Sequence, residues 1–215
     1  YAGAYVKDPQ VGLHKWVVSF DLNSLYPHLI MQYNISPETI VDMTNQSTSV
    51  DSMLDEMFDT DFLKTENQTL TPNGALFTRK KHGFLPELLF KMYNERKVEK
   101  KKMLQAQQEY ENTKNPELLK KISRHGNKQM ALKIALNSAY GAIGNQYFRF
   151  YDIRIAEAVT YGGQLSIRWI EKSLNKHLNG LLQTDNVDYV LASDTDSVYI
   201  TFDTLIERLK NQIAL

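Results

Sequence analysis

The stretch VLASDTDSVYI, residues 190–200, predicts a β-hairpin with carboxylates at its tip. Its apolar, β-branched ends are typical of two strands, which we expect at 187–192 and 197–202, and Ser-Asp-Thr-Asp-Ser between them has the composition of a turn. Taken alone, Asp194 and Asp196 need only cap this turn through hydrogen bonds to the backbone. The rest of the chain decides between that structural role and a metal site.

The bulk composition is that of an ordinary globular protein. The chain has 215 residues, 42% of them hydrophobic and 23% charged, which fits one large domain or two small ones. No apolar run approaches the roughly 18–20 residues of a membrane span, so we expect no membrane partner. The absence of cysteine excludes disulfides and thiolate metal sites. The first residues, YAGAYVKDPQ, include neither an initiator methionine nor a signal peptide, and we interpret the chain as a fragment or a processed product.

The charges are segregated although the formal net charge is zero. Between Arg79 and Lys133 fifteen Lys and Arg stand against six Glu, whereas between Pro37 and Pro72 eight acidic residues stand against one lysine. A basic segment of this kind is typical of contact with a polyanion, and the alternative is a solvated helix face. Several of its lysines fit that alternative best: Lys97, Lys101, Lys102, Lys120 and Lys121.

The local patterns predict an α+β fold. A strand over 15–20 ends at Asp21, and a helix follows with Ser24 as its N-cap and Pro27 in its first turn. Residues 42–75 read as acidic loops with short strands or helices. Long helices over 86–110 and 117–142, separated by NTKNP, predict an antiparallel helical hairpin. A helix over 153–178, a turn over 179–186, the β-hairpin and a last helix capped by Asp203 complete the chain.

Three carboxylates are expected to converge where strands end. If the strand before Asp21 neighbours the β-hairpin, Asp21, Asp194 and Asp196 meet at one edge of the sheet. Clustered carboxylates repel unless a cation neutralises them, and all-oxygen ligands favour Mg²⁺. Two such ions about 4 Å apart can drive an in-line phosphoryl displacement. The second strand-end aspartate makes the metal site the better interpretation.

The helical hairpin carries a complementary set of cations. Arg96 and Lys100 are i,i+4 neighbours on its first helix, and Lys133 and Asn137 are i,i+4 neighbours on its second helix, with Tyr140 and Gly141 continuing the stripe. Arg binds phosphate bidentately and Lys binds it as a point charge. The three cations therefore predict a grip on a nucleoside triphosphate.

Three segments together resemble the motifs of family B DNA polymerases. DLNSLYPHLI (21–30) resembles motif A, usually D-x-x-S-L-Y-P-S; KIALNSAYGAIG (133–144) resembles motif B, K-x-x-x-N-S-x-Y-G; and ASDTDSVYI (192–200) resembles motif C, usually Y-G-D-T-D-S. The flanking NISPETI and YAGAYVK resemble the replicative polymerases of tailed bacteriophages. The resemblance covers nearly the whole chain, but only the palm and fingers of such an enzyme.

The resemblance implies an architecture and a reaction. We expect a palm, an antiparallel sheet backed by helices, formed by residues 1–83 and 144–215, with an inserted fingers hairpin over 84–143. The reaction would be transfer of a deoxynucleotide to a primer 3′-hydroxyl with release of pyrophosphate. The implied cofactor is a pair of Mg²⁺ ions, with Mn²⁺ as a substitute, and the partners are primer-template DNA and deoxynucleoside triphosphates.

The resemblance also implies a role for each site residue. Asp21 and Asp196 would bridge the metals, with the backbone carbonyl of Leu22 as a further ligand and Asp194 assisting nearby. Ser24, Leu25 and Tyr26 would cradle the triphosphate, the ring of Tyr26 lying under the sugar where it excludes a 2′-hydroxyl. The remaining expectations concern the hairpin: phosphate contacts from Arg96, Lys100 and Lys133, support of the triphosphate pocket from Asn137, and contact near the templating base pair from Tyr140 and Gly141. Leu25 and Tyr140 are also compatible with plain core positions.

The chain departs from the family pattern in two places and leaves two alternatives open. His28 replaces a serine, and Ala192-Ser193 replaces Tyr-Gly; neither removes a metal ligand. The proofreading exonuclease and thumb domains of such enzymes are not in this sequence, so a split polymerase or DNA-binding remnant, inactive alone, is one alternative. An Asp-x-Asp glycosyltransferase is the other, although it has no use for the three cations. For a viral polymerase the expected location is the cytoplasm of an infected bacterial cell.

Overall fold

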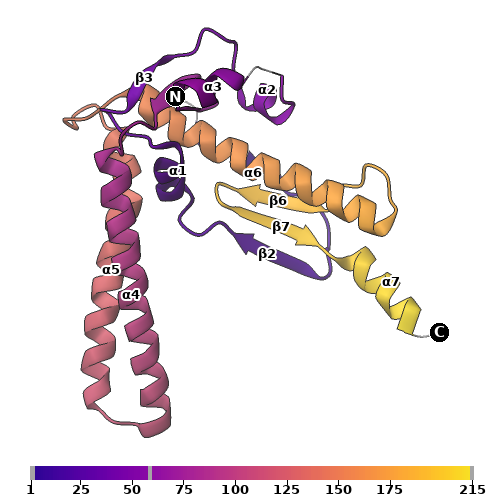
Figure 1. Ribbon diagram of the computed structural model, residues 1–215. Coiled ribbons are helices and arrows are strands. Elements are labelled where there is room, and N and C mark those ends of the chain that lie inside the picture. The colour runs from indigo at the N-terminus through magenta and orange to yellow at the C-terminus, as the bar shows by residue number, and fades with distance from the viewer. Residues whose placement is uncertain (1–2, 58–59, 214–215) are drawn as a thin grey trace.

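The computed structural model describes residues 3–57 and 60–213 and is a mixture of long helices and two antiparallel sheets (Figure 1). Residues 1–2, 58–59 and 214–215, which belong to the expected first and third parts of the chain, lie outside this description. The expected α+β class is therefore confirmed. Within the described ranges no helix is long and apolar enough to cross a bilayer.

The larger sheet brings distant parts of the sequence together. Its strand order is β1 (Val6–Lys7), β6 (Val190–Asp194), β7 (Ser197–Thr201) and β2 (Val17–Asp21), with every pair antiparallel. The helix α6 (Ile153–Leu182) lies along this sheet (Figure 1). A buried cluster joins the two: Ile167, Leu178, Leu182, Tyr189, Val190, Val198 and Ile200. The predicted β-hairpin is thus present, and the strand that ends at Asp21 is its neighbour.

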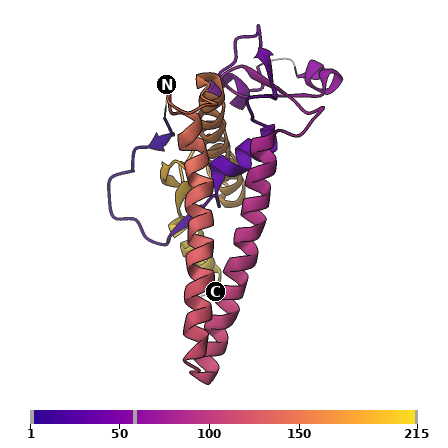
Figure 2. The same cartoon turned by 90° about the vertical axis from the view of Figure 1, so that its left-hand side faces the viewer.

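The helical hairpin consists of α4 (Phe84–Thr113) and α5 (Glu117–Ile143), as the sequence predicted. The two helices run side by side toward the tip of the hairpin (Figure 1) and diverge toward its base, as Figure 2 shows. Their shared seam holds a buried carboxylate, Glu99, whose Oε2 lies 2.6 Å from Nδ1 of His125. The connection is short because Lys114 ends α4 in a left-handed conformation and the side chain of Asn115 accepts a hydrogen bond from the Glu117 N–H.

Short elements form a second layer at the base of the hairpin. They are α1 (Leu25–Tyr33), β3 (Ile40–Met43), α2 (Val50–Leu54), α3 (Asp61–Glu66), β4 (Gln68–Leu70) and β5 (Ala75–Thr78), with sheet order β3-β5-β4. The helix α4 begins at Phe84, two residues earlier than the sequence predicted, because side chains from this layer accept hydrogen bonds from its first N–H groups. The carboxylate of Glu38 accepts from the Phe84 N–H at 2.5 Å, and the Ser36 hydroxyl accepts from the Leu85 N–H at 3.4 Å.

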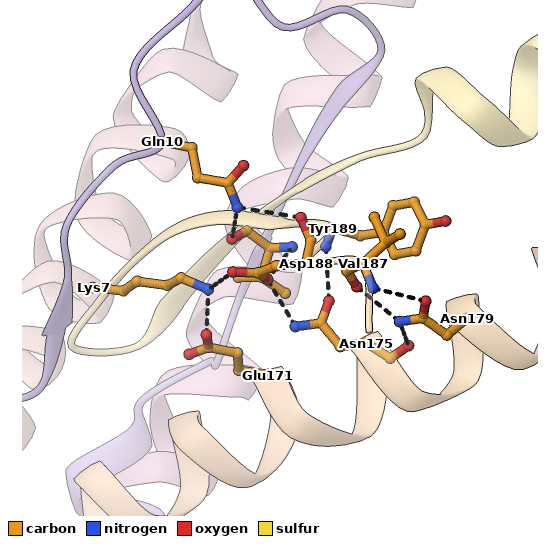
Figure 3. A network of polar contacts seen from close by, with 9 residues as sticks. Lys7, Gln10, Glu171, Asn175, Asn179, Val187, Asp188 and Tyr189 are labelled. Atoms are coloured by element: carbon orange, nitrogen blue, oxygen red, sulfur yellow. Dashed lines mark hydrogen bonds and ion pairs between the residues drawn. The ribbon is translucent and has the colours of Figure 1, made fainter. Parts of the chain in front are cut away.

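A polar network ties the start of β6 to β1 and α6 (Figure 3). The Lys7 ammonium binds Glu171 and also lies 2.6 Å from Asp188, and the amide of Asn175 contacts both Asp188 and the backbone N–H of Tyr189. The side chain of Asn179 binds the backbone of Val187 in the same way. These side chains bind the N–H and carbonyl groups of Val187 and the N–H of Tyr189, and β6 begins at Val190 and not at Val187 as predicted.

Three other helix ends differ from the sequence-based expectation. The helix α6 continues to Leu182 through Gly180, where a turn was predicted. Ser24 occupies the residue before α1, but its left-handed backbone makes no side-chain cap hydrogen bond, because N-cap bonds require an extended conformation there. The last helix, α7 (Asp203–Ile213), includes Asp203 in its first turn.

Candidate active site

The end of β2 and the β6–β7 turn bring the three predicted carboxylates to one corner of the larger sheet. Asp21 pairs with Ser197 across one side of β7, and Asp194 pairs with Ser197 across the other side. The backbone N–H of Leu22 donates to the carbonyl oxygen of Asp196 at 2.7 Å. This bond holds Leu22, the residue after Asp21, against the turn that contains Asp196. Asp21 and Asp196 therefore lie at the same end of the sheet, which faces α1 and the α4–α5 hairpin (Figure 1).

The electrostatics of this corner disfavour charge on Asp196. Burial raises the pKa of the Asp196 carboxyl above its ordinary value, and the neighbouring charges of Asp21 and Asp194 raise this pKa further. The register agrees with this, because Asp21 and Asp194 both pair with Ser197, the residue after Asp196. A bound cation would remove the repulsion between these carboxylates.

Asp194 is engaged by its neighbour in the turn. Its side chain is exposed, as is that of Asp21, and its Oδ1 accepts a hydrogen bond from the Thr195 hydroxyl at 2.9 Å. Among the described residues no group of three or more acidic, histidine or cysteine side chains is arranged to hold a metal ion. Asp21, Asp194, Asp196 and nearby backbone carbonyls offer only oxygen donors, which fits a hard cation such as Mg²⁺.

The turn itself is anchored from the N-terminal segment. The Thr195 N–H donates to the carbonyl oxygen of Tyr5 at 3.0 Å, and Val6 pairs with Asp194. Thr195 adopts a left-handed φ of 54°, which a tight two-residue connection requires. The strand therefore extends through Asp194, and the turn is shorter than the five residues that the sequence predicted.

Ser193 replaces the glycine of the usual motif and lies buried in β6. Its hydroxyl oxygen has no hydrogen-bond partner in the part of the chain that the structure describes. We expect Ser193→Ala to raise the free energy of unfolding by about 1 kcal/mol, because it removes a desolvated polar group. Chemical denaturation measures this difference. Ser197→Ala is the matched control, since the Ser197 hydroxyl donates to the Asp194 carbonyl at 3.2 Å; an equal gain in both variants would contradict the prediction.

The side chain of Tyr26, in the first turn of α1, contacts Tyr140 near the end of α5. The two ring centroids lie 4.7 Å apart with their planes tilted by 52°. Leu25, the preceding residue, is buried. The predicted sugar-contacting ring and the predicted base-pair-contacting ring are thus in direct contact, which joins the Asp21 segment to the end of α5.

The His28 departure creates a contact between α1 and α4. The His28 ring meets the Tyr93 ring edge-on, with centroids 4.7 Å apart, and its Nδ1 lies 2.9 Å from the Ser24 carbonyl oxygen. Asn23 also reaches Tyr93, its amide donating to the hydroxyl at 3.4 Å. Nothing in the local sequence pattern pointed to Tyr93, because its partners are 65 to 70 residues away in the chain.

The three predicted phosphate-binding cations occupy different surroundings. Arg96 is half-buried, and its Nε has no hydrogen-bond partner among the described residues. Lys100 is exposed and lines a groove of about 550 Å³ that runs from Asn23 along α4 past Tyr93. Lys97 and Lys101, interpreted above as solvated, line the same groove. They are additional candidates that the spacing argument missed.

Lys133 lies on the exposed side of α5, nearer to the base of the hairpin than the other two cations. The register follows from Lys128, which lies 2.7 Å from Glu95 of α4. Lys133 is a further roughly 7.5 Å along the helix axis toward the sheet. Asn137 and Gly141 are exposed on the same stripe, and a Cβ atom added at Gly141 would lie more than 4 Å from the described atoms outside its own stretch of helix.

Comparison with known proteins gives one consistent result. A model of DNA polymerase family B matches residues 1–214. The DNA-directed DNA polymerase of Escherichia phage RB69 is 34% identical and that of Enterobacteria phage T4 is 32% identical, each over 97% of this chain. A solved family B DNA polymerase from the archaeon Pyrobaculum calidifontis superposes on 97% of the chain with a TM-score of 0.62 and 26% identity. The chain spans about a quarter of each: 27% of the phage proteins and 23% of the archaeal chain.

Proposed function

The chain belongs to DNA polymerase family B, and on that premise we propose that it carries the nucleotidyl-transfer centre of a DNA-directed DNA polymerase. The observation that carries the proposal is the Leu22–Asp196 backbone hydrogen bond, which holds the Asp21 strand end against the Asp196 turn. In this proposal residues 1–83 and 144–215 are the palm, and residues 84–143 are the fingers.

Asp21 and Asp196 are the proposed metal ligands, together with the carbonyl oxygen of Leu22. Two Mg²⁺ ions, or Mn²⁺ in their place, would activate the primer 3′-hydroxyl and stabilise the departing pyrophosphate. The two carboxylates supply the negative charge that holds such ions, and the pKa of Asp196 is raised by burial first and by the charge of Asp21 second. Asp194, outside this pair, would assist through the shape and charge of the turn.

The proposed nucleotide site lies between this corner and the hairpin. Tyr26 would support the deoxyribose, Ser24 and Leu25 would border the triphosphate, and Asn137 would support its pocket. Arg96, Lys100 and Lys133 would bind the phosphates, with Arg96 using its fork geometry and the lysines acting as point charges. The unpartnered Nε of Arg96 supports this assignment, because a buried guanidinium nitrogen without a partner is costly unless a ligand completes it.

The proposed partners are primer-template DNA and deoxynucleoside triphosphates. Tyr140 and Gly141 would lie near the templating base pair, where the open space beside Gly141 leaves room for a base. Because the chain spans about a quarter of its relatives, the exonuclease and thumb functions would come from other segments or another chain. Family membership argues against the glycosyltransferase alternative.

Single-nucleotide primer extension by the full-length protein tests this proposal. We expect template-directed, Mg²⁺-dependent addition of the complementary deoxynucleotide with release of pyrophosphate. Extension that appears only when a separate thumb-containing polypeptide is added would favour the split-polymerase alternative. Binding of primer-template DNA without extension under either condition would favour a DNA-binding remnant.

Lys133→Ala should weaken nucleotide use about 10- to 100-fold, since a charge-assisted phosphate contact contributes roughly 1.5–3 kcal/mol. Arg96→Lys should also be harmful, because a point charge cannot reproduce a bidentate contact. Steady-state extension across nucleotide concentrations measures both effects.

The matched control is Lys121→Ala. Lys121 is exposed and lies near the beginning of α5, at the tip of the hairpin and far from the proposed site. This substitution should change nucleotide use little. Equal and small effects for all three variants would mean that the basic hairpin is a general polyanion surface and not a nucleotide clamp.

A further inference from the structure

The ring of Tyr26 lies directly against the backbone of α6 at Gly163. A Cβ atom added at Gly163 would stand 2.9 Å from Cε1 and 3.6 Å from Cδ1 of Tyr26. Nonbonded carbon atoms approach favourably only to about 3.5–4.0 Å. The observed ring position therefore requires a residue without a side chain at this point of α6.

The ring of Tyr26 also contacts the ring of Tyr140. Its centroid lies 4.7 Å from that of Tyr140, and both tyrosines pack against the main buried cluster. A methyl group at Gly163 would move the ring away from α6 and alter its contact with Tyr140. Gly163 of α6 and Tyr140 of α5 thus both help to set the position of the ring.

The backbone conformation at Gly163 does not itself demand glycine. Among the described residues the glycines with left-handed φ are Gly12 and Gly74, and Gly163 lies within a regular helix. Glycine is disfavoured in helix interiors relative to alanine. The requirement at this position is therefore steric.

We propose that Gly163 is a positioning residue for the sugar-contacting ring and so determines how the site discriminates between deoxyribonucleotides and ribonucleotides. This inference rests on the proposed polymerase function and on the proposed role of Tyr26. Gly163 touches neither metal nor nucleotide in this view; it acts only through the Tyr26 ring. The local sequence offered one indication, a Gly-Gly pair in the middle of a helix.

The adjacent glycine is a matched control. A Cβ atom at Gly162 would lie 3.7 Å from Leu29 Cδ1 and 3.8 Å from Tyr33 Cε2, which is ordinary van der Waals contact. Both positions lie in the interior of α6 and pack against α1. Gly162→Ala and Gly163→Ala are therefore the same chemical change, one residue apart, with and without a clash against Tyr26.

The experiment is single-nucleotide extension by the full-length protein with matched deoxy- and ribonucleoside triphosphates over a range of concentrations. For Gly163→Ala we expect a higher KM for the deoxynucleotide and a change of about fivefold or more in the ratio of the two kcat/KM values. For Gly162→Ala we expect both quantities to stay within about twofold of the unsubstituted protein. Equal behaviour of the two variants would overturn the inference.

A double-mutant cycle with Tyr26→Ala separates ring positioning from a general structural role. Once the ring is absent, Gly163→Ala should change the discrimination ratio by less than about twofold. A change of the same size in both backgrounds would overturn the inference, because the effect would then not pass through Tyr26. If Gly163→Ala alone does not fold, recovery of folding by Tyr26→Ala supports the steric contact, and failure to recover contradicts it.

The two proposals fail in distinguishable ways. An unsubstituted protein that extends no primer contradicts the proposed function. Thermal-unfolding midpoints of the unsubstituted protein, Gly163→Ala, Tyr26→Ala and the double variant then still test whether Gly163 and the Tyr26 ring are in contact. Gly163→Ala should lower the midpoint only when the Tyr26 ring is present. Additive shifts in those midpoints would reject the contact itself.

Discussion

Asp21→Ala and Asp196→Ala are each expected to reduce nucleotidyl transfer by more than about a thousandfold, which corresponds to roughly 4 kcal/mol of transition-state stabilisation. Each change removes a carboxylate proposed to be shared by two metal ions, so neither ion keeps its position. Single-turnover primer extension with saturating nucleotide and Mg²⁺ measures the loss. Extension that survives either change within about tenfold would reject the metal assignment.

Asp194→Ala supplies the comparison for this prediction. Its Oδ1 is bound to the Thr195 hydroxyl and it is not one of the two proposed shared ligands, so its loss should be milder than the loss of either of them. An effect as large as that of Asp196→Ala would return Asp194 to the metal site. The three variants together decide which two of the three carboxylates act as the pair.

The fold should survive loss of the Asp196 charge. The raised pKa of Asp196 means that its ionised form is less favourable in the folded protein than in the unfolded chain. As the pH rises through the folded-state pKa of Asp196, ionisation therefore lowers the free energy of unfolding of the metal-free protein. Asp196→Asn should therefore leave thermal stability in a chelator equal or higher at neutral pH, which a thermal melt with and without Mg²⁺ measures.

Tyr26→Ala should admit ribonucleotides, because it opens space beneath the 2′ carbon of the bound sugar. Loss of a steric clash is expected to change discrimination by about 2–3 kcal/mol, or roughly 30- to 150-fold in the ratio of kcat/KM values. Deoxynucleotide use should also weaken, since the ring packs against Gly163 of α6 and the ring of Tyr140. Competitive incorporation of matched ribo- and deoxynucleotides measures the ratio.

Tyr26→Phe is the control for that prediction. It retains the ring that contacts Gly163 and Tyr140, so discrimination should remain close to that of the unsubstituted protein. An unchanged ratio in Tyr26→Ala would assign the sugar gate to a different residue. A large change in Tyr26→Phe would assign discrimination to the hydroxyl and not to the ring.

The sequence predicted those parts of the fold that depend on local pattern. The helical hairpin, the strand before Asp21 and the β-hairpin after Val190 all have periodicity and turn residues within a few positions of one another. Their ends were less accurate where side chains from elsewhere take part. β6 begins at Val190 because Asn175 and Asn179 bind the preceding backbone, and α4 begins at Phe84 because Ser36 and Glu38 receive its first N–H groups.

Site residues that belong to a recognisable motif could be predicted from the sequence. Residues that matter only through tertiary packing could not. Asp21 and Asp196 could be paired from two strand ends, but the Leu22–Asp196 bond that joins them depends on sheet register. Tyr93 and Gly163 were missed because their importance arises from contacts with α1, far away in the sequence. A single sequence contains no record of such contacts.

The long separation between β2 and β7 has a consequence for synthesis of the protein on the ribosome. The α4–α5 hairpin is built from nearby residues and can form as soon as it emerges, whereas β2 must wait for β7, about 180 residues later, before it has a partner. Until then Val17, Val18 and Phe20, which remain exposed even in the folded chain, form an unpaired apolar strand that can associate with other nascent chains. We therefore expect the strand that ends in the catalytic candidate Asp21 to benefit from chaperone protection during translation.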